Sequence, residues 1–160
     1  MTVLVTVGGF LGAGKTTLIA KAASILVERG LGVGILTNDQ AADLVDTALV
    51  RLARFPVAEV AGACFCCAFD QFHEELDRLS AITAPDVILA EPVGSCVDIA
   101  ATVLRPLHRK SPGLFRIAPF TVILDPAAWR LARNAQGMSE STAYIYHTQL
   151  LEGDVIDVGR

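Results

Sequence analysis

Apolar and polar residues recur along this chain of 160 residues in two patterns, one typical of buried strands and one of helices. Short β-branched and apolar runs predict strands at 2–7, 32–37, 86–90, 119–124 and 154–158, and a shorter apolar segment lies at 57–60. Apolar residues three and four positions apart predict helices that begin at residue 15 and that cover about 40–54, 69–79, 96–106, 126–135 and 140–152. Residues 109–113 predict a surface loop. The alternation predicts an α/β fold with a mostly parallel, doubly wound sheet flanked by helices, and ligands at the carboxyl ends of its strands.

Residues 9–17 (GFLGAGKTT) match the phosphate-binding motif G-x-x-x-x-G-K-[ST], and they lie between a predicted strand and a predicted helix, as the motif requires. Glycines let the backbone bring N–H groups against phosphate oxygens, and the positive end of the following helix favours the same anion. We expect Lys15 to reach the β- and γ-phosphates, Thr16 to give its hydroxyl to Mg²⁺, and Thr17 to lie on the α-phosphate side. A glycine-rich turn without a ligand is the alternative. The residues expected at the nucleotide are Gly9, Gly12, Ala13, Gly14, Lys15, Thr16 and Thr17.

The composition fits a single compact domain around this loop. Hydrophobic residues make up 52% of the chain and the mean hydropathy is +0.50, as expected for a parallel sheet covered on both faces. No apolar run approaches the ~20 residues that cross a bilayer, and the chain starts in a strand rather than a signal peptide. We therefore expect a cytoplasmic protein with no membrane partner. The net charge of −4 and the pI of about 5.3 argue against a nucleic-acid partner.

Acidic residues follow two of the predicted strands. Asp39 ends the strand at 32–37 and is expected at the same edge of the sheet as the phosphate loop, where a carboxylate could hold a Mg²⁺-bound water or orient the attacking one. Glu91 ends the next central strand, and Gly94 follows it by three positions, so its N–H could sense a γ-phosphate. The alternatives are an Asx cap at Asp39 and an ordinary turn after Glu91.

Three of the four cysteines, Cys64, Cys66 and Cys67, fall within four positions. Thiolates are soft ligands that suit Zn²⁺ and similar ions, and an open fourth position would suit a protein that releases its metal. Core packing and a reversible thiol redox pair are the alternatives. His73 is a candidate fourth ligand, although a place beside the apolar stripe of its helix is the better interpretation. Cys96 is interpreted as a small buried hydrophobe without a metal role.

Together, the phosphate loop, Asn38-Asp39, the cysteine triplet and Glu91-Pro-Val-Gly94 resemble the CobW/HypB/UreG family of metal-linked GTPases, and within it the CobW-like branch. The resemblance implies a G domain that hydrolyses GTP with Mg²⁺ and couples hydrolysis to delivery of Zn²⁺, Co²⁺ or Ni²⁺ to a metalloenzyme client. By matching position, Asp39 and Glu91 are the carboxylates of the two switch loops. Gly94 is the γ-phosphate sensor, and the cysteine triplet is the metal site.

The chain departs from that family pattern at its end. The base-recognition motif N-K-x-D occurs nowhere, and residues 152–156 match only the start of the strand that would precede it. A C-terminal domain is also missing, so we expect either an N-terminal piece of the G domain or a shortened relative. Guanine specificity and a nucleotide- or metal-dependent dimer are therefore implied by resemblance alone. A non-hydrolytic metal-binding or redox module with a vestigial phosphate loop is an alternative function. A small-molecule kinase is another, disfavoured because no arginine-rich lid is found.

Overall fold

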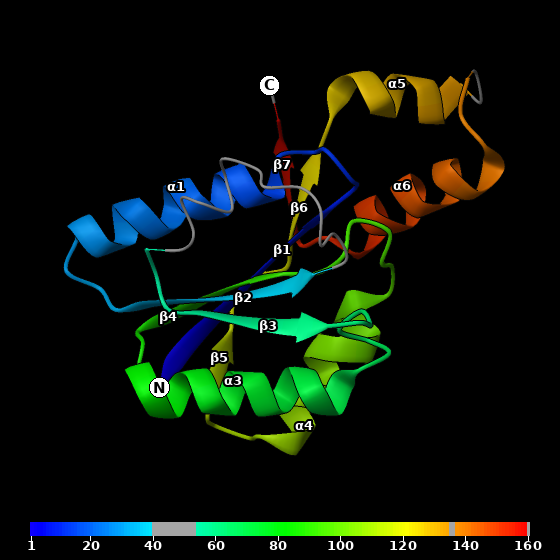
Figure 1. Ribbon diagram of the computed structural model, residues 1–160. Coiled ribbons are helices and arrows are strands. Elements are labelled where there is room, and N and C mark those ends of the chain that lie inside the picture. Colours follow the sequence, from blue (N-terminus) through cyan, green and yellow to red (C-terminus); the bar gives the residue numbers. More distant parts are fainter. Residues whose placement is uncertain (40–53, 135–136, 160) are drawn as a thin grey trace.

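The computed structural model describes residues 1–39, 54–134 and 137–159. They contain one seven-stranded sheet with the order β3-β2-β4-β1-β6-β7, and β5 pairs with β1 beside that path (Figure 1). Every pairing recorded in the described residues is parallel. The strands are β1 (Thr2–Gly9), β2 (Val33–Asp39), β3 (Val57–Ala61), β4 (Val87–Glu91), β5 (Phe115–Ile117), β6 (Thr121–Leu124) and β7 (Val155–Val158). The helices are α1 (Lys15–Glu28), α3 (Phe69–Thr83), the π-helical turn η1 (Ala100–Leu104), α4 (Arg105–Lys110), α5 (Pro126–Asn134) and α6 (Glu140–Glu152).

Two apolar layers hold helices to opposite faces of the sheet. Val87 and Leu89 of β4 belong to the layer under α1, whereas Ile88 and Ala90 belong to the layer under α3 and α4. Figure 1 shows α1 and α3 on opposite sides of the strands. Successive side chains of a strand point to opposite faces, so a strand buried on both faces must be apolar throughout. This burial explains the unbroken apolar run of β4.

The loops that carry the candidate chemistry leave the sheet at one edge. Strand β1 runs directly into the phosphate loop, β2 ends at Asp39, and β4 ends at Glu91. In the register of the sheet, Thr37 is paired with Glu91, and Asp39 with Ala61 at the end of β3. All four strands are parallel, so their carboxyl ends, followed by the phosphate loop and the cysteine loop, lie together. The predicted α/β architecture, with a parallel sheet flanked by helices, is confirmed, and the phosphate loop and the cysteine loop both lie at this edge.

Most predicted elements are confirmed by the structure, and one central helix is displaced. The helix predicted over 96–106 is wrong at both ends, because η1 begins at Ala100 and α4 continues to Lys110. Asp98 has φ of 60°, a left-handed conformation that a right-handed helix cannot include, and its carbonyl accepts the N–H groups of Ala101 and Thr102. Arg109 and Lys110, predicted in a loop, therefore form the last turn of α4.

Two further differences concern short or undescribed segments. Strand β5 was not predicted, because three residues are too few to show a strand pattern. It forms a strand because it pairs with Thr2 to Leu4 of β1. The helix predicted over 40–54 falls almost wholly on residues 40–53, which lie outside the described part of the chain. The last residue of the helix predicted over 126–135 also lies outside it. Within the described residues, no helix is both long and apolar enough to span a bilayer.

Candidate nucleotide and metal site

The phosphate loop has the backbone that its sequence predicts. Gly9, Gly12 and Gly14 all have positive φ, and the Ala13 N–H donates to the Phe10 carbonyl at 3.1 Å to close the turn. A Cβ added at Gly9 would lie 2.6 Å from the carbonyl oxygen of Ile123 in the neighbouring strand β6. Helix α1 then begins without a side-chain cap and without an acidic residue in its first turn. Its first N–H groups and its dipole are thus directed at this loop, the arrangement that binds phosphate groups.

Three side chains converge where the loop meets the end of β4. Lys15 is only 6% exposed, and its Nζ lies 3.3 Å from the carbonyl oxygen of Phe10 and 3.9 Å from Oε1 of Glu91. The Thr16 hydroxyl donates to the same Oε1 at 2.9 Å. Glu91 therefore contacts both side chains that the motif assigns to phosphate and Mg²⁺. The structure thus brings together three of the residues predicted from sequence.

Burial shifts both charged groups of this cluster. It lowers the pKa of Lys15 and raises the pKa of Glu91, and in each case the opposite charge of the partner counters the shift. For each group, the opposite charge of its partner is the largest influence that favours the charged form. Ligands that replace one partner, such as phosphate oxygens at Lys15 and a divalent cation at Glu91, would compensate the same charges.

The loop after β4 lies directly against the phosphate loop at Gly94. A Cβ added to Gly94 would be 2.7 Å from the backbone nitrogen of Leu11 and 3.0 Å from the carbonyl carbon of Phe10, so only glycine permits this approach. The buried side chain of Gln149 on α6 donates to the carbonyl oxygens of Gly94 at 3.0 Å and Cys96 at 2.9 Å. Helix α6 thus holds this loop in place.

Gln149 and Tyr146 are site residues that the sequence analysis missed. The ring of Tyr146 lies over Phe10 of the phosphate loop with centroids 4.6 Å apart, and Gln149 is three positions later on the same face of α6. A glutamine in the apolar stripe of a helix is the signal that could have been noticed, since a buried amide requires hydrogen-bond partners.

The cysteine loop, residues 62–68, is organised by a side chain from another strand. Asn38 near the end of β2 accepts the N–H of Phe65 at 3.0 Å and donates to the carbonyl oxygens of Val60 at 2.8 Å and Ala63 at 2.7 Å. Phe65 is fully buried and stacks near Phe72 of α3, with ring centroids 4.7 Å apart. The buried ring and the amide bonds fix the loop on both sides.

This loop geometry brings the three thiols together. Sγ of Cys64 lies 2.9 Å from that of Cys66, and Sγ of Cys66 lies 4.0 Å from that of Cys67. All three sulfur atoms lie within 4.8 Å of one another, the one such metal-ligand cluster found among the described residues. The carbonyl of Cys64 accepts the N–H groups of Cys67 and Ala68, which curls the backbone around the sulfurs.

The pKa of the Cys64 thiol is lower than that of an ordinary cysteine. Burial opposes ionisation of Cys64, but hydrogen bonds from Cys66 and Cys67 outweigh it and lower its pKa to about 7. Burial and the neighbouring Cys64 raise the pKa of Cys66 to about 12. A thiolate beside two thiols can bind a soft cation, which then displaces the remaining protons.

His73 lies apart from the thiol cluster. Its Nε2 is 2.5 Å from the hydroxyl of Ser111, its Nδ1 is 3.4 Å from a carboxylate oxygen of Asp77, and its ring lies 6.4 Å from that of Phe69. The interpretation that it borders the apolar stripe of α3 agrees with these contacts. Asp39 is the last residue of β2, and its side chain lies outside the part of the chain that the structure describes.

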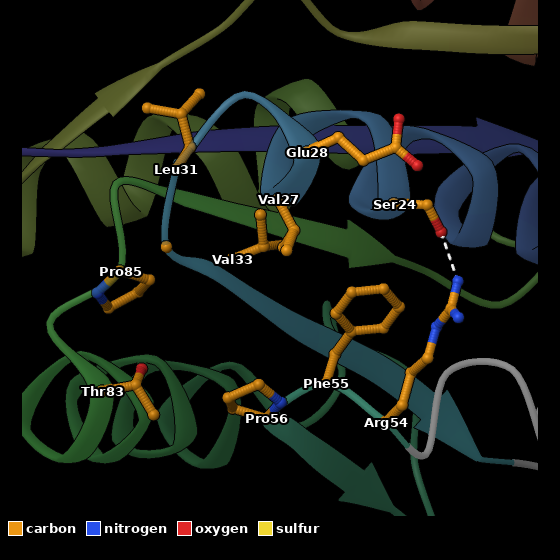
Figure 2. Close-up of a pocket in the computed structure, with 11 residues that line it drawn as sticks. Ser24, Val27, Glu28, Leu31, Val33, Arg54, Phe55, Pro56, Thr83 and Pro85 are labelled. Atoms are coloured by element: carbon orange, nitrogen blue, oxygen red, sulfur yellow. Dashed lines mark hydrogen bonds between the residues drawn. The ribbon is translucent and has the colours of Figure 1, made fainter.

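A separate cavity of about 490 Å³ lies at the opposite edge of the sheet (Figure 2). It opens between the end of α1 and the segments that lead into β3 and β4, and Arg54 donates across its rim to the Ser24 hydroxyl at 2.6 Å. Val27, Val33 and Phe55 make its lining largely apolar. It is remote from the phosphate loop and is not part of the nucleotide site.

The fold and the phosphate loop define a P-loop nucleotide-binding domain that carries a thiol cluster at the same sheet edge. The family model for the CobW/HypB/UreG nucleotide-binding domain matches residues 3–158, and the chain belongs to this family. A search of curated proteins finds no match.

Solved structures show the same fold. The hydrogenase maturation factor HypB from Archaeoglobus fulgidus is 17% identical with a TM-score of 0.62, and the match covers 98% of this chain and 65% of that one. HypB from Helicobacter pylori in complex with nickel is 14% identical with a TM-score of 0.62, over 97% and 62%. The signal recognition particle receptor FtsY from Elizabethkingia anophelis is 18% identical with a TM-score of 0.57, over 99% and 50%. The chain thus spans less than two thirds of the length of these proteins.

Proposed function

We propose that this chain is a metallochaperone GTPase domain, which binds GTP with Mg²⁺, hydrolyses it, and thereby changes its affinity for a transition metal destined for a client metalloenzyme. The observation that carries the proposal is the convergence of the three thiols at the sheet edge that also holds Lys15, Thr16 and Glu91. Membership of the CobW/HypB/UreG family supports the pairing of nucleotide and metal.

In this proposal the phosphates of GTP take over contacts that the side chains now make with one another. Lys15 leaves the Phe10 carbonyl and Glu91 for phosphate oxygens, while backbone N–H groups from Gly12 to Thr16 surround the phosphates. Thr16 would give its hydroxyl to Mg²⁺, and Asp39 and Glu91 would hold waters of that ion. When bound, Mg²⁺ neutralises charge that develops on the phosphate oxygens.

Gly94 reports whether the third phosphate is present. Its backbone already touches that of Leu11, and its N–H would donate to the γ-phosphate. Hydrolysis removes this acceptor and frees the loop from β4 to η1. The switch therefore needs a small residue at 94 and a loop whose position α6 supports through Gln149.

The metal is the cargo of this cycle and binds at Cys64, Cys66 and Cys67. Sulfur ligands favour Zn²⁺ among common divalent ions, and they also bind Co²⁺ and Ni²⁺. HypB from Helicobacter pylori, which has a similar fold, was solved in complex with nickel. The exposed Cys67 gives a client access to the ion.

A thiol redox module is the second candidate, and one observation favours it. Cys64 has a pKa of about 7 and its Sγ lies 2.9 Å from that of Cys66, so exchange with an external disulfide would oxidise the pair to a Cys64–Cys66 disulfide and release the external disulfide as two thiols. Reduced protein that binds one equivalent of Zn²⁺ without oxidising would favour the metal site. Rapid formation of a Cys64–Cys66 disulfide at mild potential, with no metal binding, would favour the redox module.

The nucleotide half of the proposal is tested by replacing Lys15. Lys15→Ala should lower GTP affinity by roughly 10- to 100-fold, the effect of losing a hydrogen bond from a charged group. The matched control is Lys21→Ala, an exposed lysine of the same helix. Isothermal titration with Mg²⁺ present measures both, and circular dichroism verifies the fold. Equal affinity of Lys15→Ala and the parent chain would refute nucleotide binding at this loop. Competition with ATP in the same titration tests the base.

A further inference from the structure

A groove of about 530 Å³ lies between the helical segment formed by η1 and α4 and the residues that follow β5. The two helical turns join without a break, because Leu104 and Arg105 both have right-handed helical backbone angles. Arg105, His108 and Arg109 line the groove from this segment, and their spacing of three and four positions keeps them on one side of it. One wall of the groove thus carries two arginines and a histidine.

The rest of the groove is largely apolar. Its other apolar lining residues are Ala100, Leu104, Ile117 and Ala118. Among the described residues that line it, Asp154 is the single acidic one, and its Oδ2 already accepts the N–H of Phe120 at 2.8 Å. A surface of this kind suits a ligand that combines negative charge with an apolar body.

The two arginines are exposed and unpaired. Within the part of the chain that the structure describes, neither Arg105 nor Arg109 has a recorded ion pair, although the chain has a net charge of −4 and acidic groups are plentiful. The next residue, Lys110, instead pairs with Asp70 of α3 at 2.6 Å. A guanidinium is a planar fork that matches a carboxylate. Two such unpaired forks beside an apolar surface therefore form a binding site for carboxylates.

The helix dipole explains only part of this arrangement. Basic side chains are favoured near a helix C-terminus, and His108, Arg109 and Lys110 form the last turn of α4. Arg105 lies near the middle of the continuous segment 100–110, where the dipole gives no such preference, yet it lines the same groove. Lys110 shares the last turn but does not line the groove. What Arg105 and Arg109 have in common is the groove.

We propose that this groove binds an acidic peptide segment of a partner protein, with carboxylates on Arg105 and Arg109 and an apolar side chain against Leu104. Each exposed ion pair contributes little in water, so a ligand with one carboxylate would bind weakly. A peptide with several carboxylates around an apolar residue uses both arginines and the apolar lining. The net charge of the chain repels acidic peptides elsewhere on its surface. Such binding needs neither metal nor nucleotide and goes beyond the proposed function.

Fluorescence anisotropy with the whole chain tests this binding. The probe is a labelled octapeptide of glutamate with leucine at every third position, and the same peptide with glutamine for glutamate should not bind. Arg109→Ala should lower affinity by roughly threefold to fivefold, and the double variant with Arg105→Ala by roughly tenfold or more. Lys110→Ala is the matched control, because it removes one charge from the same turn outside the groove, and it should change affinity by less than about twofold.

Several outcomes would overturn the proposal. Undiminished binding by the double variant, or an equal loss in Lys110→Ala and Arg109→Ala, would place the peptide outside the groove. No binding by the parent chain at millimolar peptide would remove the site. Citrate that displaces the labelled peptide as well as unlabelled peptide does would assign the groove to small anions instead. The titration contains no GTP and no Zn²⁺, so absence of peptide binding would leave the proposed function unaffected, and failure of GTP or Zn²⁺ binding would leave this result unaffected.

Discussion

The phosphate loop and the cysteine loop lie at the same sheet edge but are built in different ways. The phosphate loop is shaped by its own backbone, with positive φ at its glycines and a turn closed between Phe10 and Ala13. The cysteine loop takes its shape from Asn38 on another strand and from one ring buried beneath it. Local sequence therefore suffices for the first loop, whereas the second exists only when the sheet has formed.

This difference predicts that distant substitutions damage the thiol cluster while nucleotide binding survives. Three substitutions test how the two loops are supported, in order of expected effect, and the one at Asn38 tests this separation directly. Two remove supports of the cysteine loop, and the third changes the contact between the phosphate loop and the loop after β4.

The largest effect is expected for Phe65→Ala. The ring is fully buried between the cysteine loop and α3, so its removal should lower the free energy of unfolding by about 3–5 kcal/mol. Phe69→Ala is the matched control, because Phe69 is only partly buried beside the same layer, and it should cost clearly less. Urea denaturation measures both. Equal losses would mean that Phe65 is no anchor of the loop.

An intermediate effect is expected for Asn38→Ala. The substitution leaves the Phe65 N–H and the carbonyl groups of Val60 and Ala63 without their partner, so the three sulfurs should spread and Zn²⁺ affinity should fall by roughly tenfold or more. GTP affinity should stay within about twofold of the parent, because phosphate contacts do not involve Asn38. Parallel titrations with Zn²⁺ and with GTP separate the two effects. A matching loss of GTP affinity would contradict the separation of the two loops.

The smallest effect on binding is expected for Gly94→Ala. The added Cβ would meet the Leu11 nitrogen at 2.7 Å and must move the loop after β4 outward. GDP affinity should hardly change, since GDP has no γ-phosphate, whereas GTP hydrolysis should slow by roughly 10-fold or more, as for loss of one positioned donor. Ser95→Ala serves as control. Phosphate release under single-turnover conditions is the measurement, and an unchanged rate would remove Gly94 from the switch.

The sequence predicts those parts of the site whose geometry is determined within one short segment of the chain. Lys15, Thr16 and the start of α1 follow from a motif, and Glu91 follows from the rule that ligands gather at the carboxyl ends of parallel strands. The convergence of Cys64, Cys66 and Cys67 was similarly expected from spacing. The roles of these residues toward nucleotide and metal remain predictions that the experiments above address.

The remaining features depend on contacts between segments far apart in the chain. Gln149 reaches Gly94 and Cys96 across more than 50 positions, and no pattern in α6 reveals its targets. Such long-range placement is visible only once the sheet brings the loops together.

The central claim is that metal and nucleotide share one switch, and linked titrations test it most directly. Zn²⁺ affinity of the reduced chain should be measured with Mg²⁺ and no nucleotide, with GDP, and with a non-hydrolysable GTP analogue, against a variant with Cys64, Cys66 and Cys67 all replaced by serine. The account predicts Zn²⁺ binding that the triple variant loses and that differs at least about fivefold between the two nucleotides, a typical coupling between linked sites. Zn²⁺ affinity that is identical in all three nucleotide states would contradict it.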